Sequence, residues 1–137
     1  MQAKELEQVP LFAGLSKKER QQVARHADLV DLPAGHHLCD QGAFAHEFFV
    51  LVEGTVEVTQ DGAHLVDLAA GDFFGEVALV AHDRRTASVV ASTPITAIVM
   101  HQRDFDTMRH EIPHVAAQIH QAVQARSPRH VDEPSED

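Results

Sequence analysis

Short apolar segments with a period of two, separated by glycine or proline turns, fill the chain from residue 29 to residue 101. Such alternation places apolar side chains on one face of a strand, and the turns bring neighbouring strands together in antiparallel order. The clearest turn is Asp61-Gly62, which lies between two alternating segments and predicts a hairpin. Many short antiparallel strands with glycine turns are typical of a barrel or a jelly roll.

The expected strands all fall within this region. They cover residues 29–32, 36–40, 47–53, 55–59, 64–68, 86–91 and 95–101. Segment 47–53 contains a long apolar run and is expected to be the central strand. In segment 55–59, Val56 and Val58 share one face, and the polar residues share the other.

Helices are expected on both sides of this β region. Ser16 and Glu19 form a capping-box pattern, which predicts a helix over residues 17–26. Residues 103–110 can form two turns of helix. Pro113 is expected to begin the last helix, because proline is favoured at the first helical position.

Residues 73–89 combine a glycine, a carboxylate and an arginine around a short apolar turn. Gly75 has no side chain, so a ligand can approach its backbone closely. The N–H groups at the start of the following helical turn favour an anion. Arg85 supplies a planar, charged fork that suits two phosphate oxygens, and the neighbouring Arg84 is a weaker candidate. Glu76 can accept a hydrogen bond from a sugar hydroxyl. These residues predict a site for a small phosphate ester of a sugar.

The sequence of residues 74–89 resembles the phosphate-binding cassette of the cyclic nucleotide-binding domain family. The matching residues are Phe74, Gly75, Glu76, Ala78, Leu79, Arg85, Thr86 and Ala87. A second pattern of the family, Pro-Leu-Phe-x-x-Leu-Ser, matches residues 10–16. The resemblance extends from about residue 9 to residue 126. The family includes the ligand domains of the catabolite activator protein, of protein kinase A regulatory subunits and of cyclic nucleotide-gated channels.

The resemblance implies a mainly β fold with flanking α-helices. The β part would be a β-roll, that is, a double-stranded β-helix or jelly roll. N-terminal helices, a short phosphate-binding helix and C-terminal lid helices would complete a single domain at residues 1–126. The acidic tail at residues 127–137 is expected to be disordered because of its polar composition.

The resemblance also implies the role of each site residue. The cyclic phosphate would contact Gly75, Ala78, Arg85 and Thr86, and the ribose 2′-hydroxyl would contact Glu76. The pocket wall would consist of Phe74, Val77, Ala87, Val58 and Val89. The lid over the base would use His120 and Val123, although His120 stands where the family commonly has an arginine or an aliphatic residue. The ligand would be cAMP or cGMP: the hydroxyl of Thr86 slightly favours cGMP, and the choice stays open.

The function implied is that of a regulatory sensor without catalysis. Ligand binding would reposition the C-terminal helices and signal to an effector protein in trans, and a homodimer through those helices is left open. With a net charge of −10 over 137 residues, direct nucleic-acid binding is not expected. The sequence shows neither a signal peptide nor a membrane span, and the single Cys39 fits a reducing compartment, so a cytoplasmic location is expected.

Two alternative functions stay open. One is that of a degenerate domain that keeps the fold but acts through protein–protein contacts without a ligand. The other is that of a cupin-like metal enzyme, prompted by the 11 histidines. The adjacent His36 and His37 would point to opposite faces of a strand, which does not suit a shared metal ion. We therefore expect no metal site, and no nucleophile–base pattern is visible either.

Overall fold

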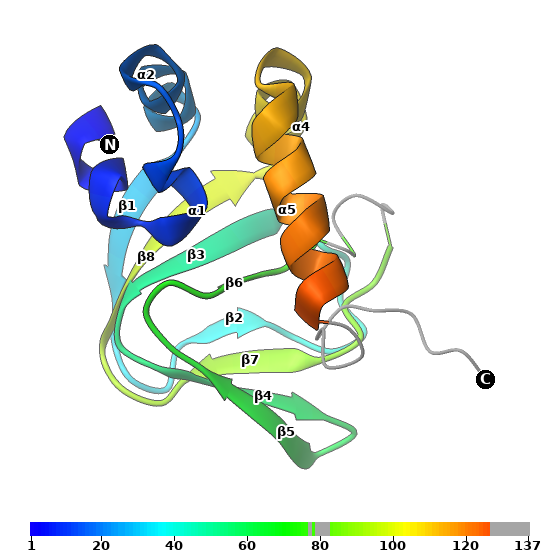
Figure 1. Ribbon diagram of the computed structural model, residues 1–137. Coiled ribbons are helices and arrows are strands. Elements are labelled where there is room, and N and C mark those ends of the chain that lie inside the picture. Colours follow the sequence, from blue (N-terminus) through cyan, green and yellow to red (C-terminus); the bar gives the residue numbers. More distant parts are fainter. Residues whose placement is uncertain (77, 79–82, 127–137) are drawn as a thin grey trace.

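The computed structural model describes residues 1–76, 78 and 83–126, with side chains up to residue 121. Two four-stranded antiparallel sheets form a β-roll, and helices from both ends of the chain lie on the same side of it (Figure 1). The expected mainly β fold with flanking helices is confirmed. Among the described residues, no helix is both long and apolar enough to span a membrane.

Each sheet combines strands that are distant in the sequence. The first sheet has the order β1 (Asp28–Leu32), β8 (Ile95–His101), β3 (Glu47–Glu53) and β6 (Phe73–Phe74). The second has the order β2 (His37–Cys39), β7 (Ser88–Ala91), β4 (Val56–Gln60) and β5 (Ala63–Leu68). All the expected strands are present with nearly the expected bounds. The pattern did not predict β6, which is too short for a period of two to be recognised and forms by pairing with β3.

The helices expected at residues 17–26, at residues 103–110 and from Pro113 onward are present. The described helices are the 3₁₀-helix η1 (Ala3–Gln8) and the α-helices α1 (Pro10–Ala13), α2 (Lys17–Arg25), α4 (Gln102–Glu111) and α5 (Pro113–Arg126). As predicted, Pro113 begins the last helix. The sequence did not predict η1, because only Leu6 of this helix is buried and it has no apolar stripe.

The strand β3 is buried on both faces, which explains its long apolar run. Phe48 and Val50 face the helices, where the ring of Phe48 lies 4.9 Å from that of Phe105 on α4. Phe49 and Leu51 face the interior of the roll, where other side chains of both sheets surround them. The central position predicted for this segment is therefore confirmed: β3 separates the two hydrophobic cores of the molecule.

The Asp61-Gly62 turn joins β4 and β5 as predicted. Both residues have positive φ angles, 53° and 81°, which a two-residue hairpin of this hand requires. The side chain of Gln41, from the loop after β2, holds the turn: its Oε1 accepts from the Asp61 N–H, and its Nε2 donates to Asp61 Oδ1, both at 2.8 Å.

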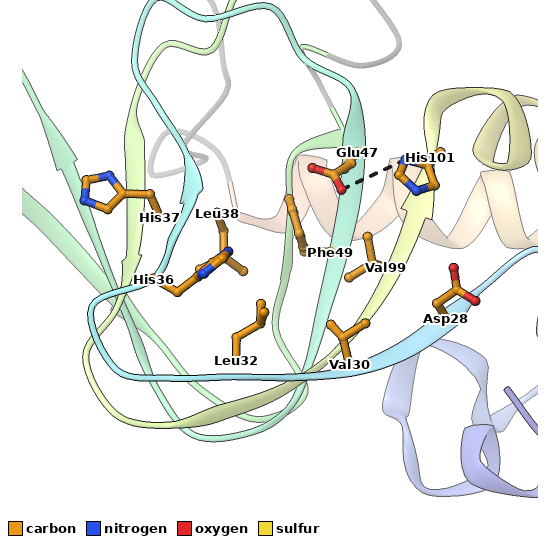
Figure 2. A pocket seen from close by; sticks show the side chains of 10 residues that line it. All are labelled: Asp28, Val30, Leu32, His36, His37, Leu38, Glu47, Phe49, Val99 and His101. Atoms are coloured by element: carbon orange, nitrogen blue, oxygen red, sulfur yellow. Dashed lines mark ion pairs between the residues drawn. The ribbon is translucent and has the colours of Figure 1, made fainter.

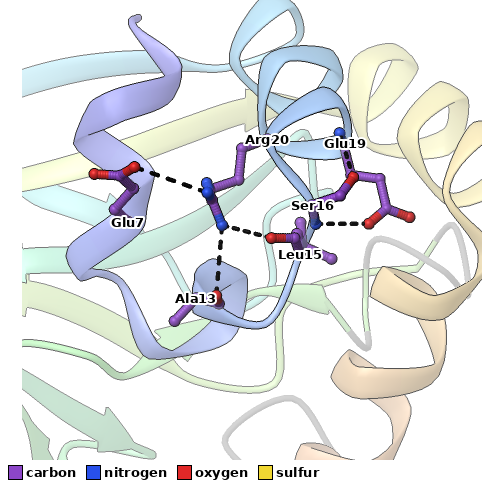
Figure 3. A network of polar contacts seen from close by, with 6 residues as sticks. All are labelled: Glu7, Ala13, Leu15, Ser16, Glu19 and Arg20. Atoms are coloured by element: carbon purple, nitrogen blue, oxygen red, sulfur yellow. Dashed lines mark hydrogen bonds and ion pairs between the residues drawn. The ribbon is translucent and has the colours of Figure 1, made fainter.

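The capping box at the start of α2 is formed as expected (Figure 3). The Glu19 N–H donates to Ser16 Oγ at 3.1 Å, and the Ser16 N–H donates to Glu19 Oε1 at 2.9 Å. Glu19 Oε2 also lies 2.8 Å from Nε2 of His114 on α5. These contacts, the Ser16 backbone N–H above all, lower the pKa of the Glu19 carboxyl group below its ordinary value. The box therefore favours the ionised carboxylate.

We expect Ser16→Ala to lower the free energy of unfolding by about 1 kcal/mol, the usual effect of losing a helix cap.

Glu19→Gln keeps a capping side chain but removes its charge, so its effect on stability should depend on pH. Because folding lowers the pKa of Glu19, its stabilisation is present above the unfolded pKa and is lost as the pH falls through the folded pKa. The difference in Tm between wild type and Glu19→Gln should thus shrink between pH 7 and pH 3. An equal difference at both values would contradict this assignment.

Candidate functional site

Arg85 lies between the cassette turn and β7, and its side chain is turned into the protein, where it is 5% exposed. Its Nη1 donates to the carbonyl oxygen of Gly75 at 2.8 Å, and its Nη2 donates to the carbonyl oxygen of Glu47 at the start of β3. The arginine and the glycine that the sequence singled out are therefore in contact. Guanidinium groups bind phosphate through these same N–H groups. The guanidinium of Arg85 lies beside the turn that begins at Gly75.

Gly75 has no side chain, and the guanidinium of Arg85 lies where a side chain at this position would be. Its φ of +96° is a conformation that residues with a side chain rarely adopt. A Cβ atom here would lie 2.8 Å from Arg85 Nη1 and 3.0 Å from the carbonyl oxygen of Glu47. The next residue, Glu76, begins a short helical stretch and is 2% exposed, and Ala78 in that stretch is also buried. Glycine is thus required here both for the backbone angle and for the packing of Arg85.

The loop between β2 and β3 holds the backbone of Arg85 in place. The Gly42 N–H donates to the Arg85 carbonyl at 2.9 Å, and the Arg85 N–H donates to the Ala43 carbonyl at 2.8 Å. One further bond joins the Ala45 N–H to the Asp83 carbonyl at 3.2 Å. Sequence reasoning missed the contribution of this loop. Backbone hydrogen bonds carry no side-chain signature, so the sequence pattern did not reveal them.

Arg84 makes different contacts from Arg85, although the two are adjacent. Its guanidinium carbon lies 4.2 Å from the centroid of the Phe44 ring, and its Nη1 donates to the Gly42 carbonyl at 2.7 Å. Both Arg84 and Phe44 are exposed. Arg84 therefore stabilises the outer surface of the loop, whereas Arg85 is directed at Gly75.

The other predicted site residues lie in several environments. Phe74, Val58, Ala87 and Val89 are buried in the interior of the roll, with Phe74 stacked on Phe49 at 5.1 Å. Their role as a pocket wall stays a prediction.

Thr86 is half-buried, and its carbonyl accepts from Gln60 Nε2 at 3.0 Å. His120 is exposed on α5. Val77 and Leu79 lie outside the described residues, and so does the side chain of Val123. The predicted lid contacts therefore stay predictions.

A metal centre finds no support in the part of the chain that the structure describes. There, no group of three or more histidine, cysteine, aspartate or glutamate side chains is arranged to hold a metal ion. The chemistry of the described site is that of hydrogen-bond donors and one guanidinium around a glycine. Such groups bind and orient an anion.

Residues 29–111 match the family model described as the cyclic nucleotide-binding domain. This match covers more than half of the chain and includes β1 to α4, with the whole cassette between them. The chain therefore belongs to the cyclic nucleotide-binding domain family. The resemblance inferred from the cassette residues is confirmed.

The relatives are longer proteins that contain such a domain. A cyclic nucleotide-gated potassium channel of Rhizobium etli is 34% identical over 118 residues, which cover 86% of this chain and 33% of the channel. Among solved structures, cAMP-bound PfPKA-R has a TM-score of 0.80 at 21% identity, covering 93% of this chain and 44% of that one. The chain thus spans only a third of the length of the curated relative.

A second solved structure has the same fold. The regulatory subunit of a cAMP-independent protein kinase A from Trypanosoma brucei also gives a TM-score of 0.80, at 22% identity, covering 92% of this chain and 45% of that one. Both solved structures therefore share the fold of this chain.

Proposed function

We propose that this chain binds cAMP or cGMP and acts as a regulatory module of a signalling system. The observation that carries the proposal is the inward-turned guanidinium of Arg85, which donates to the carbonyl oxygen of Gly75. An arginine with a solvent-exposed role would extend into water, as a surface cation normally does. Here the protein instead holds the positive charge beside the residues that match the phosphate-binding cassette.

The proposed site offers a separate contact for each part of the ligand. The cyclic phosphate binds the guanidinium of Arg85, the backbone N–H groups of Gly75 and Ala78, and the side chain of Thr86. Glu76 accepts a hydrogen bond from the ribose 2′-hydroxyl, which keeps its carboxylate away from the phosphate charge. Since the chain carries a net charge of −10, the local donors must offset the repulsion that the whole molecule exerts on an anion.

The proposed signal passes through the helices that pack on the outer face of the first sheet (Figure 1). His26, at the end of α2, lies 3.5 Å from Asp104 and 3.6 Å from Glu111, both on α4. The contact between Glu19 and His114 joins α2 to α5. The N-terminal and C-terminal helices are therefore linked, and a displacement of one group on ligand binding would move the other. The effector is proposed to be a protein in trans.

Isothermal titration calorimetry with cAMP and cGMP tests the proposed function, with 5′-AMP as the acyclic control. We expect saturable binding of at least one cyclic nucleotide and much weaker binding of 5′-AMP, whose phosphate has a different charge and shape. Failure of both cyclic nucleotides to bind would favour the degenerate domain that acts through protein contacts alone.

Glu76→Gln tests the proposed ribose contact. Losing the charge-assisted hydrogen bond should weaken binding of the cyclic nucleotide by up to about tenfold. The 2′-deoxy analogue of the cyclic nucleotide lacks the ribose 2′-hydroxyl. Wild type and Glu76→Gln should therefore bind this analogue with similar affinity. If the substitution weakens both ligands equally, Glu76 acts on the structure of the turn and does not contact the ribose.

A further inference from the structure

A cavity of about 220 Å³ lies between the edge strands β1 and β2 of the two sheets (Figure 2). Its apolar wall comes from four strands and consists of Val30, Leu32, Leu38, Phe49 and Val99. Of the described residues that we assign to the nucleotide site, none lines this cavity. The cavity is therefore a place, separate from the nucleotide site, at which a ligand could bind.

The polar groups of the cavity are unevenly distributed. Figure 2 shows Asp28, Glu47 and His101 on the side of the first sheet, with His36 and His37 on the side of β2. Strand register explains the grouping: Glu47 is paired with His101 across β3 and β8, and Asp28 is paired with Val99 across β1 and β8. Both carboxylates consequently border the same end of the apolar wall.

The charges that line this cavity favour a cation. Asp28 and Glu47 are acidic, and no lysine or arginine is found among the described residues that line it. Nδ1 of His101 lies 4.0 Å from Glu47 Oε2. An anion would meet two carboxylates and no fixed positive charge. An ammonium group would meet those carboxylates beside an apolar surface, in a molecule whose net charge of −10 attracts cations.

We propose that this cavity binds a small organic cation, a primary amine attached to a compact apolar body. The apolar part would cover the wall formed by residues such as Val30, Leu38 and Val99, and the ammonium group would lie at the end of the wall that Asp28 and Glu47 border. The cavity is smaller than the pockets of roughly 300–1,000 Å³ that hold drug-sized ligands, so one ring with a short chain is a suitable size. The proposal is independent of nucleotide binding.

A charge series of similar size tests the proposal on the wild-type protein at pH 8. The probes are 2-phenylethylamine, 2-phenylethanol and 3-phenylpropanoate, titrated by methyl NMR, which reports both affinity and location. We expect the amine to bind at least about tenfold more tightly than the alcohol, as a charge-assisted contact implies, and the acid to bind most weakly. The methyl signals of Val30, Leu32 and Val99 should shift, and those of Val58 and Val89 should not.

Matched variants separate the charge of the cavity from the charge of the chain. The double variant Asp28→Asn/Glu47→Gln should weaken binding of the amine about tenfold or more and leave the alcohol unchanged. Glu53→Gln removes a carboxylate from the other end of β3, outside the cavity, and should have little effect.

Three results would overturn the proposal. They are equal affinities across the charge series, shifts confined to the methyl groups near the cassette, and no binding of the amine at millimolar concentration. All three are measured on wild type alone, so the proposal can fail even if the double variant does not fold.

Discussion

Replacing Arg85 with alanine is expected to weaken binding of cAMP and cGMP by about tenfold to a hundredfold, the loss that one or two charge-assisted hydrogen bonds represent. The same substitution removes both donors that now bind the carbonyl oxygens of Gly75 and Glu47. Some stability should therefore be lost as well. Calorimetry on the folded variant, confirmed as folded by circular dichroism, measures the effect on binding separately.

The adjacent arginine provides a matched control. Arg84→Ala removes the same charge one residue away, but Arg84 stacks on Phe44 at the exposed surface of the loop. Its loss should change nucleotide affinity by less than about threefold, because a surface charge acts on a distant ligand only through a screened field. If Arg84→Ala and Arg85→Ala weaken binding equally, the effect comes from net charge and the proposed phosphate contact is wrong.

Gly75→Ala is expected to produce the second large effect, on both stability and binding. The positive φ of 96° costs a residue with a Cβ about 1–2 kcal/mol. The new methyl group would also lie 2.8 Å from Arg85 Nη1, so the guanidinium has to leave its position. Because a flexible side chain moves more easily than a backbone, Arg85 should be displaced from the place where we propose that it meets the phosphate. Nucleotide affinity should fall at least about tenfold.

Gly62→Ala separates backbone strain from displacement of Arg85. Gly62 has a similar φ of 81°, but a Cβ atom there would meet nothing within 4 Å. This variant should lose stability through strain alone, and its nucleotide affinity should match that of wild type. Thermal unfolding and calorimetry on both variants make the comparison. Unchanged binding by Gly75→Ala would show that the position of Arg85 in this structure is not the one that binds ligand.

Features that depend on neighbours in the sequence were predictable. The alternation in segments such as residues 55–59 identified the strands, because successive side chains of a strand point to opposite faces. Ser16 and Glu19 identified the start of α2 in the same way, since a capping box is complete within one helical turn. The cassette was also recognisable, because its glycine, carboxylate and arginine lie in one short stretch.

Other features depend on residues that folding brings together. The sequence ranked Arg85 above Arg84 as the phosphate-binding residue, but it did not reveal which groups either guanidinium contacts in the folded chain. The structure directs Arg85 to the carbonyl of Glu47, 38 residues away in the chain, and directs Arg84 to Phe44. The two-residue strand β6 likewise exists only through its pairing with β3. The contact of Arg85 with the Glu47 carbonyl and the pairing of β6 with β3 leave no local sequence pattern, because both use backbone groups that any residue would supply.

The sequence by itself determined the longer strands, the capped helix α2 and the membership of the family, all of which depend on residue types at short spacing. Only the tertiary structure decided where the guanidinium of Arg85 lies and which side chains line the cavity between β1 and β2. Asp28, Glu47 and His101 belong to three different strands, and their position along one cavity depends on sheet register. Register is set by long-range pairing and packing, so it cannot be read from any one segment of the chain.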